Sequence, residues 1–374
     1  MVRKLIMPGS TIGLLGGGQL GRMVALEAKK MGYKVICLDP TQDSPCGQVA
    51  DEQIVASFDN LEAAQKLGER SDVIIYEFES IDLEIVKQLE KKYYLPQKSS
   101  ILAISQNRVE EKEQLKKAGF PVAPFRGITN PRQLEQAITD LGYPCILKSS
   151  RGGYDGKGQM VITNDCQLDT AREMVRKGKE EWVLEKKIFF SHEISVIAAR
   201  KETGEMAVYP AAENIHRENI LHVTVVPARV ASRFELEASE ITAEIARAFK
   251  VVGLLAVEFF ITPKGLVVNE IAPRPHNSGH YTWEACFTSQ FEQLIRAVCG
   301  LQLGSTKLVT PVVMVNVFGE SLARVVKQVP YFPENVKFHF YGKRGSHAGK
   351  RKMGHLIIRT SDAEQAMSWA KGFI

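Results

Sequence analysis

The sequence of 374 residues lacks several features that would mark it for a membrane, for export or for nucleic acid. No apolar run approaches the roughly 20 residues that a membrane helix needs, and the apolar stretch before Pro8 is too short for a signal peptide. The six cysteines lie far apart, without a CxxC pair, so we expect buried free thiols in a reducing cytoplasm. A net charge of +5 is too small to indicate nucleic acid. We therefore expect a cytoplasmic protein that binds neither membrane nor nucleic acid.

Internal repeats and low-complexity segments are also missing, and the length predicts two or three domains. The first hundred residues alternate signals, with strands expected at 11–15, 34–38, 52–57 and 72–77 and helices at 19–30, 61–69 and 82–92. This βαβ series predicts a parallel sheet with helices on its faces. A helix is expected at 106–119, and antiparallel strands and helices follow at 205–216, 221–230, 254–273, 235–249 and 287–299.

A glycine loop follows the first expected strand, in TIGLLGGGQLGRM at 11–23. Gly16, Gly18 and Gly21 satisfy GxGxxG, and Asp39 closes the next apolar run, near the position of the ribose-binding acid in a dinucleotide fold. These residues alone leave open whether the loop binds NAD or another ligand.

A second glycine-rich loop, RGGYDGKGQ at 151–159, has glycine at four of residues 152–158. Backbone N–H groups of such a loop can approach a ligand closely, and with Lys157 they suit a polyphosphate. The Walker A pattern is absent, and a strand is expected to follow. Lys148, at the end of a buried strand, is a second candidate phosphate contact. A plain flexible hairpin is the alternative.

Paired carboxylates are expected on the hairpin that turns at 262–265. Positions whose numbers sum to about 527 or 528 then face one another, which sets Glu258 opposite Glu270 on one face. Two facing carboxylates among apolar neighbours repel, and a bound cation would remove the repulsion. Oxygen-only ligands favour Mg²⁺. In the alternative, one of the two carboxylates faces solvent.

A third feature is WVLEKKI at 182–188, a strand that could present main-chain groups to an adenine edge. Glu193 follows it and could accept both hydroxyls of a ribose. Exposed glutamates are common, so this feature gains meaning only from its place among the others.

The order of these features resembles the ATP-grasp family over nearly the whole chain, from Thr11 onward. The resemblance implies an α/β protein of the ATP-grasp fold with an N-terminal parallel-sheet, Rossmann-like domain at 1–107. A small lid and nucleotide-binding subdomain would follow at 108–200, and a mixed α+β catalytic domain with the metal site at 201–374. It also implies ATP and Mg²⁺ as cofactors, with Mn²⁺ as the alternative ion.

Carried onto this sequence, the ATP site of that family falls on Arg108, Lys148, Gly153, Tyr154, Asp155, Gly156, Lys157, Gly158, Gln159, Glu185, Lys186, Lys187, Ile188, Glu193, His216, Asn269 and Glu270. Glu258 and Glu270 would bind the metal. Residues 153–159 would form a mobile lid, from which Tyr154 and Asp155 would reach the substrate amine on closure, Asp155 as proton acceptor. Many members have Asn two residues after the second Glu, where this chain has Ala272, so a second magnesium would have one ligand fewer.

Five motifs in order narrow the resemblance: GGGQLGRM, YEFESI, RGGYDGKGQ, APRPHNSGHYT and GKRKMGH. Together they resemble the N5-carboxyaminoimidazole ribonucleotide synthetase family of purine biosynthesis. That resemblance implies a homodimer, aminoimidazole ribonucleotide, bicarbonate and ATP as substrates, and a carboxyphosphate intermediate that Arg274 would stabilise. The substrate-binding positions would be Gln19, Leu20, Glu77, His276, Asn277, Ser278, Lys343 and Arg351. The first glycine loop is then a substrate loop, and NAD is not implied.

Other interpretations stay open at this point. A nicotinamide dehydrogenase would explain only the first domain, and a formate-dependent glycinamide ribonucleotide formyltransferase shares the ATP-grasp architecture. A non-catalytic nucleotide-binding module would not need Lys148, Glu258 and Glu270 intact. The basic cluster at 343–352 has a solvated surface loop as its alternative, and His276 has a purely structural role as its own.

Overall fold

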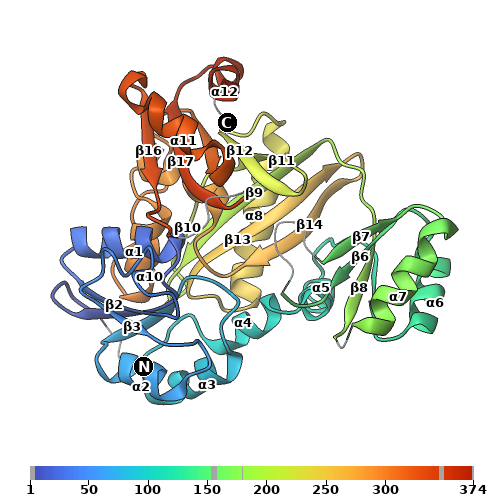
Figure 1. The fold of residues 1–374 in the computed structure, drawn as a ribbon, viewed down its shortest axis with the longest axis horizontal. Coiled ribbons are helices and arrows are strands. Elements are labelled where there is room, and N and C mark those ends of the chain that lie inside the picture. The colour runs from blue at the N-terminus through green and yellow to red at the C-terminus, as the bar shows by residue number, and fades with distance from the viewer. Residues whose placement is uncertain (1–4, 153–157, 179, 345–348, 373–374) are drawn as a thin grey trace.

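The computed structural model describes residues 5–152, 158–178, 180–344 and 349–372, which form three sheets (Figure 1). Within these ranges no helix is both long and apolar enough to cross a membrane. In Figure 1 the large sheet occupies the middle, the first domain lies below it, and the small sheet with its two helices extends to one side.

The N-terminal sheet is parallel, as the sequence predicts, because each strand returns through a helix or loop to the same edge. Its strand order is β3-β2-β1-β4. The elements are β1 Thr11–Leu15, α1 Gln19–Lys30, β2 Lys34–Asp39, β3 Glu52–Val55, α2 Leu61–Glu69, β4 Val73–Tyr76 and α3 Leu83–Lys92. Asn60 and Asp82 cap α2 and α3 by accepting from main-chain N–H groups, which fixes where these helices begin.

Two connecting helices lead to a small antiparallel sheet of order β5-β8-β6-β7. The sequence predicts the second helix but not the first, α4. The elements are α4 Ser99–Ser105, α5 Arg108–Lys117, β5 Phe125–Ile128, α6 Pro131–Leu141, β6 Cys145–Ser149, β7 Gln159–Ile162, η1 Asp165–Gln167, α7 Leu168–Lys177 and β8 Trp182–Lys186. A strand does follow the second glycine loop, as expected.

The large sheet is antiparallel and has the order β14-β13-β9-β11-β12-β15-β17-β16, with β10 beside β9. Its strands are β9 His192–Arg200, β10 Met206–Val208, β11 Ala212–Arg217, β12 Ile220–Val226, β13 Gly253–Thr262, β14 Gly265–Ala272, β15 Val312–Phe318, β16 Val336–Phe340 and β17 Lys352–Arg359. The antiparallel segment expected at 205–216 consists of two strands, β10 and β11, separated at Pro210, which has no N–H for a ladder.

Helices complete the last domain: α8 Ser232–Ala248, η2 Asn277–Gly279, α9 Thr282–Ala285, α10 Gln290–Val298, α11 Gly319–Gln328, η3 Val329–Tyr331 and α12 Ala363–Lys371. The helix expected at 287–299 begins later than predicted. The side chain of Ser289 caps its start by accepting from Glu292 N.

The two faces of the large sheet differ in chemistry. Val196, Val257 and Phe259 point to one face, where α8 covers them in an apolar core. Side chains alternate along a strand, so Ser195 and Glu258 point to the other face. The functional side chains discussed below lie on that second face.

All six cysteines are free, as expected. Four are buried, whereas Cys166 is exposed and Cys286 is half-buried, so the expectation of buried thiols is wrong for these two. Cys166 lies in the short helix η1 at the surface of the small sheet, where no apolar layer covers it.

Candidate active site

The first glycine loop is filled by the protein's own carboxylates. Gly18 N and Gly21 N donate to the two oxygens of Glu77 at 2.5 and 2.6 Å. Asp39, at the position of a ribose-binding acid, accepts from Gly17 N at 2.8 Å. Burial raises the pKa of Glu77 to about 7 in spite of the two N–H donors. The anion site at the start of α1 is therefore occupied, and it leaves no place for the pyrophosphate of a dinucleotide.

The same loop meets the C-terminal basic segment. Lys343 Nζ donates to Gln19 Oε1 and to the main-chain oxygen of Lys352, both at 2.7 Å, and lies 5.4 Å from the ring centre of Tyr341. Leu20 packs beside Gln19 against the N-terminal core. The structure thus brings together two predicted substrate residues, Gln19 and Lys343, that are 324 positions apart in the sequence.

Arg351, the other predicted phosphate ligand, is exposed and donates to the main-chain oxygen of Arg344 at 2.9 Å. Two neighbours fasten the basic segment to other elements: Arg344 pairs with Asp43 of the N-terminal domain, and Lys350 pairs with Glu218. Part of this cluster therefore makes ion pairs with other elements, while the Arg344 and Lys350 side chains stay exposed.

A buried glutamate holds the predicted phosphate lysine. Lys148 Nζ lies 3.2 Å from Glu185, and Lys112 Nζ of α5 lies 3.4 Å from the same carboxylate. Burial alone would raise the pKa of Glu185, but the two lysines outweigh it and hold the pKa below its ordinary value. Lys112 also donates to the main-chain oxygen of Asn269 at 3.1 Å. The Glu185 side chain therefore orders the phosphate lysine, which sequence reasoning did not foresee.

The segment predicted to meet adenine runs from Glu185 to Ile188. Lys186 Nζ donates to the main-chain oxygen of Gly142 at 3.2 Å, and Lys187 N donates to Pro144 O at 3.0 Å. These groups anchor the segment to the start of β6. An adenine edge would have to meet other main-chain groups of this segment.

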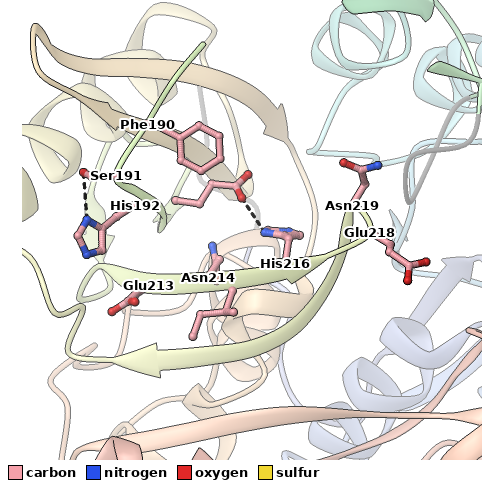
Figure 2. A pocket seen from close by; sticks show the side chains of 10 residues that line it. Phe190, Ser191, His192, Glu213, Asn214, His216, Glu218 and Asn219 are labelled. Carbon is pink, nitrogen blue, oxygen red and sulfur yellow. Dashed lines mark hydrogen bonds and ion pairs between the residues drawn. The ribbon is translucent and has the colours of Figure 1, made fainter. Parts of the chain in front are cut away.

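A cavity of about 440 Å³ adjoins this segment and is lined by Phe190, Ser191, His192, Glu193, Glu213, Asn214, Ile215, His216, Glu218 and Asn219 (Figure 2). Figure 2 shows Asn214 and His216 rising from β11 beneath Phe190. His216 Nδ1 lies 2.8 Å from Glu193 Oε2, and this contact outweighs burial to raise the pKa of His216. Both predicted ATP residues, Glu193 and His216, therefore line one cavity.

The paired carboxylates lie as the sequence predicts. Glu258 of β13 is paired directly with Glu270 of β14. Glu258 is buried while Glu270 is exposed, and burial together with the charge of Glu270 raises the pKa of Glu258 to about 8. Glu111 of α5 is a third buried carboxyl near Glu270, with its pKa raised to about 8 by the same two causes. The exposure of Glu270 matches the alternative in which one carboxylate faces solvent, but two buried carboxyls beside an exposed one still suit a divalent cation.

A β-bulge explains how Asn269 joins this site. Glu258 pairs with Glu270 but the next residue, Phe259, pairs with Val268, so Asn269 is the extra residue of β14. In a regular strand Asn269 and Glu270 would point to opposite faces. Here Asn269 Nδ2 donates to Glu258 Oε2 at 3.4 Å. The bulge therefore places three oxygen- or nitrogen-bearing side chains on the same side of the hairpin.

The predicted substrate residues after β14 have different surroundings. The two polar side-chain atoms of Asn277, Oδ1 and Nδ2, are buried without a hydrogen-bond partner among the residues that the structure describes. A buried amide in that state is ready for a ligand. His276 Nε2 lies 3.4 Å from Glu258 Oε1, and burial and Arg274 lower the pKa of His276 to about 3, so its ring is neutral. The Ser278 hydroxyl is buried and bonded to His276.

Arg274 is held by a partner that the sequence did not suggest. Its Nη2 donates to Glu79 Oε1 at 2.8 Å, its Nε donates to the other oxygen of Glu79, and its Nη1 donates to Pro275 O at 3.0 Å. Burial would raise the pKa of Glu79, but the ion pair lowers it to about 2. Among the described residues, one N–H on each terminal nitrogen of Arg274 has no partner and can meet an anionic ligand.

The predicted lid falls mostly outside the described residues: Gly153, Tyr154, Asp155, Gly156 and Lys157 are all beyond them. Gly158 and Gln159 lead into β7, where Gln159 pairs with Lys148. Arg108 begins α5, and its N–H donates to Ser150 O at 2.9 Å, at the start of the glycine loop.

Sequence reasoning missed Lys112, Glu111, Glu79 and His280. Both ring nitrogens of His280 are buried and lack partners in the described part of the chain. Its position in APRPHNSGHYT was the only available signal. Glu79 lies within the motif YEFESI, whereas Lys112 and Glu111 carry no local pattern, because their partners are distant in the sequence.

Three family models match successive parts of the chain. A ribonucleotide synthetase preATP-grasp domain matches residues 9–106, an ATP-grasp domain matches 113–291, and a phosphoribosylaminoimidazole carboxylase C-terminal domain matches 312–368.

Relatives match over nearly the full length. The chain is 48% identical over 359 residues to the N5-carboxyaminoimidazole ribonucleotide synthase of Bacillus subtilis, covering 96% of this chain and 93% of that protein. The crystal structure of an ADP complex of an N5-carboxyaminoimidazole ribonucleotide synthetase has a TM-score of 0.96 and 50% identity, covering 100% of this chain and 98% of that one. An Aspergillus clavatus N5-carboxyaminoimidazole synthase, in complex with ADP and 5-aminoimidazole ribonucleotide, has a TM-score of 0.90 and 29% identity, with 97% of each chain covered.

Proposed function

Because the chain belongs to the N5-carboxyaminoimidazole ribonucleotide synthase family of ATP-grasp enzymes, we propose that the site described above performs that family's reaction. The chain is an ATP-dependent enzyme that converts aminoimidazole ribonucleotide to N5-carboxyaminoimidazole ribonucleotide in purine biosynthesis. The dehydrogenase, the formylating enzyme and the non-catalytic module are thereby set aside. The observation that carries the assignment of roles is the facing pair Glu258 and Glu270 beside the lysine pair on Glu185.

ATP occupies the space between the small sheet and the large sheet in this proposal. Lys148, Arg108 and the glycine loop contact its phosphates, and Glu193 accepts the ribose hydroxyls. Glu258 and Glu270 hold Mg²⁺, with Mn²⁺ as the alternative ion. The donor set fits, because two facing carboxylates remain poorly compensated in the chain alone. When bound, the ion neutralises charge on the phosphates.

The proposed reaction proceeds in two steps. An oxygen of bicarbonate attacks the γ-phosphorus of ATP, the bond to the β-phosphate oxygen breaks, and carboxyphosphate and ADP form. The exocyclic amine then attacks the carboxyl carbon, either of carboxyphosphate itself or of the CO₂ that it releases with phosphate; phosphate leaves, and the amine loses a proton. The remaining N–H groups of Arg274 stabilise the anionic carboxyphosphate. Asp155, which lies outside the described residues, accepts the proton in this scheme, with Tyr154 beside it.

Aminoimidazole ribonucleotide lies on the side of the first glycine loop. Lys343 and Arg351 bind its 5′-phosphate as cationic donors. Gln19 is positioned by Lys343 for the ribonucleotide. The amide of Asn277, which has no partner in the described part of the chain, orients the imidazole. His276 and Ser278, which flank Asn277 and are hydrogen-bonded to each other, hold the Asn277 segment in place.

A co-substrate test decides the function. Phosphate release from ATP should require both aminoimidazole ribonucleotide and bicarbonate, and formate with glycinamide ribonucleotide should not replace them. Release that needs no co-substrate, or that follows formate, would contradict the proposal. The matched control omits bicarbonate in degassed buffer, where the rate should drop to background.

The proposed assembly is a cytoplasmic homodimer, as the family resemblance implies. Light scattering on the purified protein should give the mass of two chains, and a mass of one chain would contradict this part.

A further inference from the structure

We propose that Ser195 and Asn214 are positioning residues that fix the proton of the His276 ring on Nε2, where it supports the metal-binding carboxylate of Glu258. The proposal rests on the proposed role of Glu258 as a metal ligand. It assigns a function to a row of buried polar groups that the reaction scheme does not otherwise use.

These groups form one continuous chain of contacts. Thr224 Oγ1 donates to Asn214 Oδ1 at 3.1 Å, and Asn214 Nδ2 donates to Ser195 Oγ at 2.9 Å. Ser195 Oγ donates to Ser278 Oγ at 2.7 Å. Ser278 Oγ lies 2.7 Å from His276 Nδ1, and the chain therefore joins the nucleotide cavity, where Asn214 is a lining residue, to the His276 ring.

The sheet register explains why these side chains meet. Ser195 of β9 is paired directly with Glu258 of β13, and Asn214 of β11 is paired with Thr224 of β12. All four point to the face opposite α8. The three polar links between them and His276 are at most 5% exposed, since Ser195 and Ser278 are 1% exposed and Asn214 is 5% exposed. Water is therefore a poor competitor for their hydrogen bonds.

The direction of donation along these hydrogen bonds determines the tautomer of His276. Ser195 Oγ accepts from Asn214 Nδ2 and donates its single proton to Ser278 Oγ. Ser278 then gives its own proton to His276 Nδ1. Ser278 N also donates to Nδ1, at 3.4 Å, so Nδ1 faces two donors and must be the unprotonated nitrogen. The proton of the neutral ring therefore sits on Nε2.

The Nε2 side of the ring lies next to Glu258. His276 Nε2 is 3.4 Å from Glu258 Oε1, a close approach that is longer than a typical hydrogen bond. An Nε2–H group there orients one carboxylate oxygen, as partners behind a metal ligand commonly do. The opposite tautomer would place a lone pair against that oxygen. Ser195 and Asn214 act on the carboxylate only through His276.

Nitrogen NMR reads the tautomer directly. The chain has eight histidines, so ¹⁵N-histidine labelling gives a small set of ring signals, and His276→Gln identifies the one that matters. In the wild-type protein without metal we expect the protonated nitrogen of His276 to be Nε2. Protonation on Nδ1 would overturn the proposal, whatever the activity of the enzyme.

Substitution of Ser195 tests the row of hydrogen bonds that leads to the His276 ring. In Ser195→Ala the Ser278 hydroxyl is free to accept, so the His276 signals should move toward a mixture of tautomers, and Ser195→Thr should restore them. Thr242→Val is the matched control, because it removes a buried hydroxyl that donates to Ala238 O at 2.7 Å on α8, on the opposite face. Unchanged signals in Ser195→Ala, or equal changes in Thr242→Val, would overturn the proposal.

Kinetics separate this role from substrate binding. Ser195→Ala should raise the half-saturating Mg²⁺ concentration by about 10-fold and leave the KM for aminoimidazole ribonucleotide unchanged. A rise in that KM with unchanged magnesium dependence would show that the row of hydrogen bonds from Asn214 to His276 serves the substrate, and would overturn the proposal. Loss of the co-substrate requirement in the wild-type enzyme would instead contradict the proposed function, while the NMR result would still stand.

Discussion

The first glycine loop and the hairpin of β13 and β14 handle charge in opposite ways. The loop has the sequence of an anion site, yet its N–H donors are satisfied by Glu77. The hairpin matches no named ligand motif, yet it sets Glu258 against Glu270. The loop contains its own anion, the carboxylate of Glu77, whereas the hairpin has two facing carboxylates and needs a cation from outside.

This difference shows how a motif should be read. Donor-rich glycine spacing predicts an anion, but the anion can belong to the chain, and then the loop is structural and shapes what lies beside it. Like charges that face one another have no such internal solution here, since burial raises the pKa of Glu258 instead. An external ligand is therefore indicated where the chain leaves a conflict, not where it leaves a familiar pattern.

The largest expected effect is on the hairpin. Glu270→Gln should lower kcat about 1000-fold, because several kcal/mol of charge stabilisation are lost at the phosphates. The free energy of unfolding without metal should stay the same or rise by about 0.5 kcal/mol, since a facing like charge is removed. Turnover at saturating Mg²⁺ and urea unfolding are the measurements, with exposed Glu237→Gln as control. Near-normal turnover at low magnesium would contradict the metal assignment.

The loop should respond in the reverse manner. Glu77→Gln puts an amide NH₂ against one of two backbone donors, so the free energy of unfolding should fall by about 2 to 3 kcal/mol. The KM for aminoimidazole ribonucleotide should rise because the loop that carries Gln19 shifts, while the KM for ATP should change little. Urea unfolding and separate titrations of the two substrates check this. Unchanged stability would show that the loop does not depend on its internal carboxylate.

The pH dependence of stability should separate the two regions further. The pKa of Glu258 is about 8 when folded, against an ordinary 4.5, so the folded chain keeps a proton that the unfolded chain loses. The stability due to that proton is complete below pH 4.5 and is lost as pH rises through 8. We expect Glu258 alone to account for a fall of about 2 kcal/mol between pH 6 and 8 in EDTA, and Glu111, whose pKa is also about 8, adds to it.

Variants identify the source of this fall. Glu258→Gln should remove its part of the slope in EDTA, and saturating Mg²⁺ should remove the same part, since a cation favours the carboxylate. Glu77, whose pKa is about 7, should contribute a slope that magnesium leaves unchanged. A slope that is equal with and without metal in the wild-type protein would contradict the magnesium site at Glu258.

Local patterns predicted much of this molecule. The helices at 19–30 and 61–69 have the expected bounds, because their apolar period is encoded within each segment, and Asn60 also caps the second one. The pairing of Glu258 with Glu270 followed from the position of the turn alone. The chemistry of the hairpin was therefore readable before its neighbours were known.

Long-range partners could not be read in this way. Arg274 meets Glu79 from 195 positions away, and Ser195 meets Ser278 from 83 positions away, with no periodicity to indicate either contact. The bulge at Asn269 was also invisible, because only the change of register after Glu258 reveals it. The sequence thus predicted which side chains carry charge and left open which other side chains hold them.

The smallest expected effects concern the basic segment, and they ask whether the loop and that segment form one site. Lys343 is held between Gln19 and the main-chain oxygen of Lys352, whereas Arg351 is exposed and contacts main chain. An ordered, partly buried cation loses more on truncation than an exposed one. Lys343→Ala should raise the KM for aminoimidazole ribonucleotide about 10-fold, and Arg351→Ala about 2- to 3-fold, with the KM for ATP unchanged in both.

Salt provides the decisive measurement for that last pair. If both side chains bind the 5′-phosphate, added salt should weaken ribonucleotide binding in the wild-type enzyme and less so in each variant. Lys337→Ala, on the exposed part of β16, is the matched control and should retain the wild-type salt dependence. Wild-type KM values in both Lys343→Ala and Arg351→Ala would make the segment a solvated surface. The first glycine loop would then have lost the contact that makes it a substrate loop, and its carboxylate-filled interior would be its whole role.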